Sequence, residues 1–202
     1  MNKKSVEIAN SFCPQALFLF GTYKEDGAPN FGLFCWLSYC NDDGLHVMTC
    51  IGGEKLTKDR IHAGKMFSAN LVTKSILPIS DYFGNTDGYN PDKMSVPIEV
   101  MPGAVLNVPI LKDSPWSYEL EVEQVIPLSG SEIYICKIHN VIAHEALIDE
   151  NKSIKERMRL ADPVLSAGRK LESYFSLDPA VIGTWGEWAG AFAKKQTGAG
   201  QF

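Results

Sequence analysis

The fold is decided by residues 16–51, which read ALFLFGTY (16–23), KEDGAPN (24–30), FGLFCWLSYC (31–40), NDDG (41–44) and LHVMTCI (45–51). Three apolar and aromatic runs, Ala16–Tyr23, Asn30–Cys40 and Leu45–Ile51, are separated by two polar clusters that carry Gly, Asn and Asp. Such runs with such turns predict three antiparallel strands in a meander. A meander has to close on itself or be covered, because open strand edges invite aggregation.

The spacing of the apolar residues changes after the third run, Leu45–Ile51. Gly52-Gly53 permits a sharp turn, and Glu54–Gly64 contains good helix formers ending at a glycine, which predicts a helix. Met66–Val72 is expected to return to a strand. We expect a short helix over Ser75–Tyr82, followed by the polar loop Gly84–Asp92.

A strictly alternating run, Ser117–Ile126, follows later in the chain. It carries Tyr118, Leu120 and Val122 on one face and Glu119, Glu121 and Glu123 on the other. We expect the aromatic and aliphatic side chains to face the core and the three glutamates to face water. After the turn Pro127–Ser131, Glu132–Ala146 is expected to be its partner strand.

Short turns between strands, with one helix after the third strand, favour a mainly β fold. The prediction is an antiparallel split β-barrel with a few helices and a C-terminal helical extension. We expect a single domain over residues 1–202, with its core at about 12–150 and the extension, where the pattern becomes helical, at 151–202.

The amino-acid composition limits the kinds of molecule that this protein is expected to bind. The formal net charge of −5 argues against nucleic acid, because such proteins need a basic face to neutralise phosphates. No apolar run has the roughly 20 residues of a membrane span. The five cysteines, odd in number and without a Cys-x-x-Cys pair, are expected to be reduced and mostly buried. We therefore expect a cytoplasmic protein without membrane or nucleic-acid partners.

The best candidate for binding an anion is GGEKLT, from Gly52 to Thr57. The glycines let backbone N–H groups approach a ligand, Lys55 offers a charge, Thr57 offers a hydroxyl, and the helix that follows presents its positive end. The pattern does not match a phosphate-binding Walker loop. A glycine turn before a helix is also a common structural device, so both interpretations stay open.

The run Asn30–Trp36 is a candidate wall for a flat ring, because it combines aromatic side chains with the small Cys35. Aromatic residues in a strand are equally typical of a core. The loop around Asp81–Gly88 and Asp92-Lys93 is either functional or simply flexible. The four histidines show no metal-ligand spacing, so no metal site is predicted.

In their order along the chain these pieces resemble the flavin reductase-like family of FMN-binding split barrels, and within it the flavoredoxin-type proteins. The resemblance runs from about Pro14 to about Gly183. It rests on a small set of motifs, namely the early proline, Asp26-Gly-Ala-Pro-Asn30, Lys55-Leu-Thr57, Phe67-Ser-Ala-Asn70, Asp81-Tyr-Phe-Gly84 with Gly88 and Asp92-Lys93, and Tyr174-Phe175.

The resemblance implies FMN held between the two subunits of a homodimer. The flavin ring would be lined by Asn30, Leu33, Phe34, Cys35 and Trp36. The ribityl phosphate would be held by Cys50, Ile51, Gly52, Gly53, Lys55 and Thr57, with Asn70 and Lys93 assisting. Two departures concern this site. Cys35 stands where the family commonly has Ser or Thr, and Glu54, close to the expected phosphate, has to point outward.

The resemblance implies a flavoprotein that moves hydride or electrons through FMN, with NAD(P)H or a redox protein as donor and no catalytic side chain of its own. No Gly-x-Gly-x-x-Gly turn is present, so a nicotinamide donor would bind without a Rossmann unit. An alternative is a non-enzymatic split barrel that stores or senses a flavin. An oligonucleotide-binding barrel is disfavoured by the acidic charge.

Overall fold

In the computed structural model, which describes residues 2–168, 171–184 and 187, seven antiparallel strands make up the main sheet. In chain order they are β2 (Phe18–Tyr23), β3 (Pro29–Phe34), β4 (Leu37–Asn41), β5 (Leu45–Gly52), β6 (Met66–Leu71), β9 (Trp116–Pro127) and β10 (Ser131–Ala143). Their order across the sheet is β3-β2-β6-β9-β10-β5-β4. The three predicted opening runs all form strands, and the second run is divided between β3 and β4.

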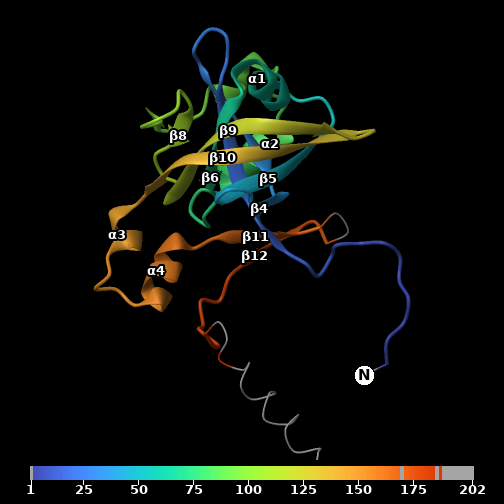
Figure 1. Ribbon diagram of the computed structural model, residues 1–202, viewed down its shortest axis with the longest axis vertical. Helices are drawn as coiled ribbons and strands as arrows, with labels where there is room; N and C mark the ends of the chain where they lie inside the picture. The colour runs from blue at the N-terminus through green and yellow to red at the C-terminus, as the bar shows by residue number, and fades with distance from the viewer. Residues whose placement is uncertain (1, 169–170, 185–186, 188–202) are drawn as a thin grey trace, which may run out of the picture.

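The sheet closes because its two edge strands are neighbours in the chain. β3 and β4 lie at opposite ends of the strand order, yet only Cys35 and Trp36 connect them. Three Cα steps separate Phe34 from Leu37, which spans about 11 Å at most. The sheet therefore curls round on itself into a barrel (Figure 1). The barrel is split between β3 and β4, because these two strands are not hydrogen-bonded neighbours. We call residues Phe34–Leu37 the seam. The predicted split β-barrel is confirmed.

Aromatic rings fill the barrel. Phe20 stacks on Phe34 with ring centroids 4.5 Å apart, and it contacts Phe67 at 4.9 Å. Around them pack buried aliphatic side chains from β5 and β9, with Tyr134 and Cys136 from β10. The same cluster joins Phe18 and Phe20 of β2, near one end of the strand order, to Val47 and Ile51 of β5 near the other, so its burial holds the closed form of the sheet.

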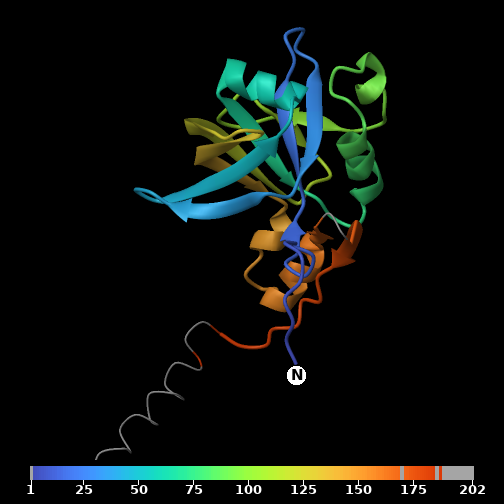
Figure 2. The same cartoon turned by 90° about the vertical axis from the view of Figure 1, so that its right-hand side faces the viewer.

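A second apolar cluster lies outside the barrel, where α2 (Leu77–Asn85) covers one face of β3 (Figure 2). Phe83 of α2 packs on Phe31 of β3 with centroids 6.0 Å apart, and both rings are almost fully buried. The helix begins two residues later than expected and extends three residues further, so the predicted loop begins later. A 3-10 helix, η1 (Pro91–Met94), ends that loop.

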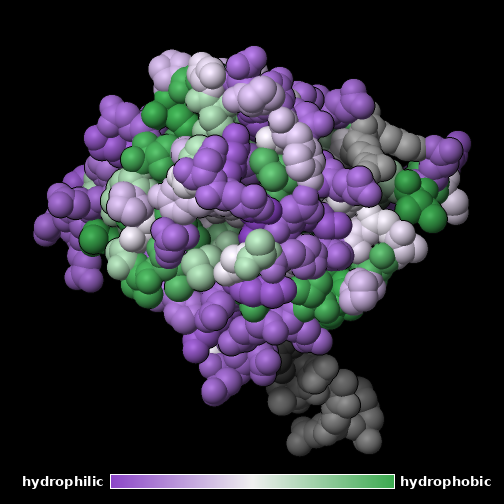
Figure 3. All heavy atoms as spheres, turned by 90° about the horizontal axis from the view of Figure 1, so that it is seen from above, coloured by the Kyte–Doolittle hydropathy of each residue, from purple (hydrophilic) through white to green (hydrophobic). Residues whose placement is uncertain are grey.

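The predicted helix forms as α1 (Leu56–Gly64), which starts two residues later than expected and lies on top of the barrel in Figure 1. Gly53 before it has φ +67°, a backbone conformation that favours glycine. Figure 3 views this end from above and shows hydrophilic residues over much of the face, with smaller hydrophobic groups between them. Within the described residues, no helix is both long and apolar enough to cross a membrane.

The expectation for Glu119 is wrong. Its side chain is fully buried, and its carboxylate accepts backbone N–H groups of Ala104, Val105 and Leu106 at 2.6–2.9 Å and the Asn140 amide at 2.7 Å. Burial raises the carboxyl pKa, but these hydrogen bonds outweigh it, so the pKa lies below its ordinary value. Alternation cannot show this, because the donors come from the loop between β7 (Val100–Pro102) and β8 (Pro109–Leu111).

The chain after Asp149 is less helical than expected. The short helix α3 (Glu145–Ile148) ends just before this part, which begins with α4 (Ile154–Ala161); Ser153 and Glu156 form a capping box at the start of α4. They are followed by two strands, β11 (Val164–Ala167) and β12 (Ser173–Ser176), which pair with β1 (Gln15–Ala16) in the order β1-β11-β12. The partner of β11 thus comes from the other end of the chain. Residues 169–170, 185–186 and 188–202 of the expected extension lie outside the described residues.

We predict that Glu119→Gln lowers the free energy of unfolding by about 2–3 kcal/mol, because a neutral amide replaces a buried carboxylate with four donors. The depressed pKa adds stability that is complete above about pH 5 and is lost as the pH falls through the folded pKa. Urea unfolding at pH 7 and pH 4 measures both effects. Glu123→Gln on the same strand is the control, because that half-exposed carboxylate pairs with His46 alone among the described residues, and it should change stability by less than about 1 kcal/mol.

Candidate functional site

Two adjoining cavities open beside β3. The first, about 260 Å³ in volume, lies between the start of α1, the end of α2 and η1, and we call it the helix cavity. The second, about 600 Å³, lies along the seam and is called the seam cavity. Leu33, Phe34, Lys55, Gly84 and Asn85 line both, so the two volumes form one continuous depression.

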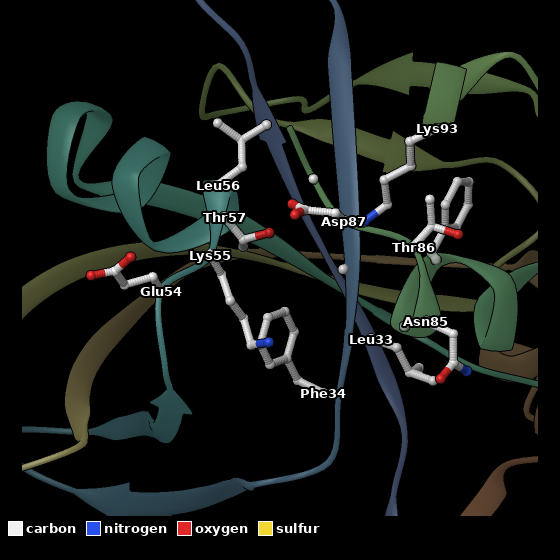
Figure 4. A pocket seen from close by; sticks show the side chains of 14 residues that line it. Leu33, Phe34, Glu54, Lys55, Leu56, Thr57, Asn85, Thr86, Asp87 and Lys93 are labelled. Carbon is white, nitrogen blue, oxygen red and sulfur yellow. The ribbon is translucent and has the colours of Figure 1, made fainter. Parts of the chain in front are cut away.

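The helix cavity receives the N-terminus of α1. The first N–H groups of an α-helix have no intrahelical acceptor, and here no side chain caps them. Thr57 and Lys55 line the cavity, whereas Figure 4 shows the Glu54 carboxylate directed away from its centre. The requirement that Glu54 point outward is therefore met. Uncapped N–H groups at the positive end of a helix favour an anion.

A buried lysine points into the same cavity. Lys93 is only 3% exposed, and among the described residues no carboxylate forms an ion pair with it. Burial lowers the pKa of its amine to about 8; Asp87 opposes this shift, while Lys55 and Lys24 add to it. In Figure 4 the Lys93 amine and the Thr57 hydroxyl face the same space. An anion bound there would stabilise the charged amine.

The wall opposite α1 is shaped by a glycine. A Cβ at Gly32 would lie 3.0 Å from Thr57 Oγ1 and 2.9 Å from a ring carbon of Phe34. Any larger residue would displace the hydroxyl or the ring. Across the cavity, a Cβ at Gly88 would lie 2.7 Å from Leu56 Cβ, so the loop after α2 approaches α1 only because this position is glycine.

The seam cavity has flat and mostly neutral walls. Trp36 and Cys35 come from the seam, Cys50 comes from β5, and Tyr174 comes from β12. The seam is held in place because Cys50 N and Thr49 Oγ1 both donate to the Trp36 carbonyl, at 3.0 and 2.8 Å. Burial raises the pKa of the Cys35 thiol, which therefore stays protonated at neutral pH. Such a cavity suits a planar, largely apolar group.

Tyr174 closes one side of the seam cavity through its hydroxyl, which donates to Asp81. Burial, and then this hydrogen bond, raise the pKa of Tyr174 to about 12, so the phenol is neutral. All five cysteines of the chain are free thiols, as expected, but only Cys136 is buried, so the expectation that most are buried is wrong.

The structure brings most of the predicted site residues together. Ten line one or both cavities: Leu33, Phe34, Cys35, Trp36, Cys50, Gly52, Gly53, Lys55, Thr57 and Lys93. Asn30 lies behind Thr57, at the helix cavity rather than beside the seam. Ile51 is fully buried in the barrel interior. Asn70 lies outside both cavities, and its amide binds Leu19 O, Ser68 Oγ, Leu111 N and Ser117 Oγ.

The site also contains residues for which the sequence predicts no specific role. Phe83, Gly84, Asn85, Thr86, Asp87 and Gly88 line the helix cavity and belong to the Asp81–Gly88 stretch, which the sequence leaves open as functional or flexible; the C-terminal strands supply Ser166 and Tyr174 to the seam cavity. The glycines of the polar loop were a usable signal, because a close backbone approach needs them. Nothing local to the sequence shows which segment they approach.

Comparison with known proteins identifies the family of the chain. The sequence matches the family described as flavin reductase like domain over residues 10–169. A search of curated proteins gives no match.

Solved structures share the fold. The flavoredoxin of Desulfovibrio vulgaris (Miyazaki F) matches with a TM-score of 0.80 and 23% identity, over 91% of this chain and 98% of that one. The FMN-binding protein from Thermus thermophilus, solved with bound p-hydroxybenzaldehyde, gives 0.72 and 19% over 91% and 98%. The 2-nitrobenzoate 2-nitroreductase of Pseudomonas fluorescens gives 0.75 and 20% over 87% of each chain.

At these identities the structural likeness shows the fold alone. The family match covers most of the chain, from β1 to the end of β11, and includes the seam and both helices that border the helix cavity. The protein therefore belongs to the flavin reductase-like family.

Proposed function

We propose that this protein binds FMN, with the phosphate in the helix cavity and the flavin ring in the seam cavity, and that it works as an oxidoreductase or electron carrier. The observation that carries the proposal is Lys93, a buried amine without an ion-pair partner among the described residues, beside the uncapped start of α1. The adjoining cavity has the flat walls that a flavin ring needs.

The residues present fit this cofactor. A phosphate dianion in the helix cavity would accept from N–H groups of α1 and from Thr57, and it would be neutralised by Lys55 and Lys93. The ring would lie against the seam, between Phe34 and Trp36 on one side and Cys50 on the other. Polar groups at one end and flat apolar walls at the other match the two ends of FMN.

When bound, FMN supplies hydride and electron transfer, and the chain supplies binding and orientation. Lys55, Lys93 and α1 would fix the phosphate, while Trp36 would shield the ring from water. Cys35 would present a protonated thiol to the ring, where the resembled proteins commonly offer a hydroxyl. Nothing in this arrangement assigns a proton-transfer step to a side chain.

NAD(P)H and a redox protein both stay as candidate donors. The nitroreductase with the same fold favours an enzyme, and the flavoredoxin favours an electron carrier. A non-enzymatic flavin store or sensor is the alternative. Holoprotein that NADH and NADPH leave oxidised, but that a reduced carrier protein reduces, would favour the carrier. A cytoplasmic location and the absence of nucleic-acid and membrane partners stay predictions from charge and sequence.

A homodimer is supported by the outer face of the sheet beside the seam. Val47 and Ile51 of β5 point into the barrel, so Met48 and Cys50 point outward, where Ile133 of β10 pairs with Cys50. Met48 is 38% exposed. This apolar surface is continuous with the seam cavity, because Cys50 contributes to both. A second copy covering it would enclose the ring.

The cofactor is tested first by an absorbance spectrum of the purified protein and by analysis of the FMN released on heating. We expect flavin bands or, for apoprotein, tight binding of added FMN. Lys55→Ala combined with Thr57→Ala should weaken FMN binding about 100-fold or more in a fluorescence titration, because the phosphate loses two charge-assisted or hydroxyl contacts. Unchanged affinity in this double variant would contradict the assignment of the phosphate to the helix cavity.

The pKa of Lys93 predicts a pH dependence. Below about pH 8 the free protein already carries the charged amine that a phosphate needs, and above it the amine loses its proton. Bound phosphate raises the pKa of Lys93, so FMN affinity should fall up to about tenfold per pH unit above pH 8. Lys93→Met should bind FMN more weakly at pH 7 and show no such fall between pH 7.5 and 9.5. Lys74→Met, which removes an exposed lysine outside both cavities, should keep the wild-type slope.

Light scattering at micromolar concentration should show a dimer. Met48→Glu should shift it towards monomer and weaken FMN binding, because a charge replaces an apolar contact on the covered face. Ile154→Glu is the control, since it changes an exposed residue at the start of α4 and should leave the dimer intact. Monomeric wild-type protein that keeps its flavin would refute a site shared between subunits.

A further inference from the structure

Asn30 is a fully buried amide that connects three elements. Its Nδ2 donates to Thr22 Oγ1 on β2 at 3.2 Å and to Thr57 Oγ1 on α1 at 3.1 Å, while Asn30 itself lies on β3. A primary amide nitrogen carries two hydrogens, so both donors are used. The side chain therefore imposes a direction on the two hydroxyl groups that it contacts.

For Thr57 this direction has a consequence. Its oxygen accepts from Asn30, so its own proton is free to be donated elsewhere, and no acceptor for it is found in the part of the chain that the structure describes. Thr57 is 4% exposed and lines the helix cavity. Figure 4 shows its hydroxyl facing the same space as the Lys93 amine. The cavity thus presents an oriented hydroxyl donor beside a buried cation.

The other atom of the same amide lacks a partner. Asn30 Oδ1 is buried and makes no hydrogen bond within the described chain. It lies beside the cavity wall, since a Cβ at Gly88 would be 3.5 Å from it. A buried acceptor without a donor is costly, and a phosphate dianion has no proton to offer it. A hydroxyl on the carbon chain next to the phosphate has one.

We infer that Asn30 is a specificity-determining residue that makes the helix cavity selective for the phosphate monoester of a polyol. It holds the Thr57 hydroxyl as a donor to the phosphate, and its Oδ1 accepts from a hydroxyl of the adjoining chain. The inference rests on the proposed function, because the ribityl phosphate of FMN is such a group. It goes further, since it gives the chain a means to distinguish FMN from riboflavin and riboflavin from a flavin without a polyol.

The first experiment compares FMN with riboflavin by fluorescence titration of variants whose folding is verified by thermal melting. Thr57→Val should lower the preference for FMN over riboflavin about 10- to 100-fold, and Thr57→Ser should restore it. Asn30→Asp should lower the same preference, because a carboxylate cannot donate to Thr57. Thr22→Val is the matched control: it removes the other hydrogen bond of the same amide, away from the cavity, and should change both affinities equally.

The second experiment compares riboflavin with lumiflavin, which lacks the polyol. Asn30→Asp keeps an acceptor at the position of Oδ1, so its preference for riboflavin should persist while its preference for FMN falls. Asn30→Leu has no acceptor and should lose the preference for riboflavin. A general loss of stability would weaken the binding of FMN, riboflavin and lumiflavin together. It would not lower the preference for FMN over riboflavin in one variant while leaving the preference for riboflavin over lumiflavin intact.

The outcomes separate the two proposals. Wild-type protein that binds no flavin would overturn both the proposed function and this inference. Wild-type protein that binds FMN, while Thr57→Val or Asn30→Asp keeps the full preference for FMN over riboflavin, would overturn the inference alone. Equal affinity of the wild type for riboflavin and lumiflavin would overturn the assignment of Oδ1 to a polyol hydroxyl.

Discussion

The two-residue connection between β3 and β4 is the constraint on which this structure depends. Cys35 and Trp36 join strands that lie at opposite ends of a seven-strand order, so the sheet has to close. Closure encloses the aromatic interior, in which β2 and β5 side chains share one cluster. It also presents the connecting residues themselves to a cavity. The element that completes the barrel is therefore the element that lines the candidate site, and β5 holds it in position through the Trp36 carbonyl.

An acidic chain can still build a local anion site, because the field in a small cavity depends on its nearest charges. The net charge of −5 is spread over the whole molecule, whereas Lys55 and Lys93 both line the helix cavity. Glu54 points away from it, so the two amines face a single lining carboxylate, that of Asp87, among the described residues. A negative net charge thus argues against nucleic acid, which contacts a large surface, and says little about whether one cavity can bind a single phosphate.

Much of the fold could be predicted from local patterns. The strands around Ala16–Tyr23 and Leu45–Ile51 and the helix ending at Gly64 follow from periodicity and turn residues, which act over a few neighbours. The glycine turn before α1 likewise located one end of the candidate site.

The wrong predictions share one cause: the contacts that decide these positions are made with residues distant in the sequence. Glu119 alternates like a surface residue but receives donors from a loop 13–15 residues away, and β11 becomes a strand because β1 pairs with it. Asn70 stands in a motif of the resembled family, yet its amide is fully occupied in joining strands. Local periodicity cannot show such contacts, because they exist only once the sheet has formed.

The seam has a dynamic consequence. Since Cys35 and Trp36 are both the hinge of the barrel and part of a binding wall, any opening of the barrel at this point dismantles the wall as well. A ligand that binds only the closed wall shifts the equilibrium away from local opening of β3 and β4. It therefore slows the exchange of the backbone amides of these edge strands with solvent. The seam would thereby report occupancy through amide exchange along β3 and β4.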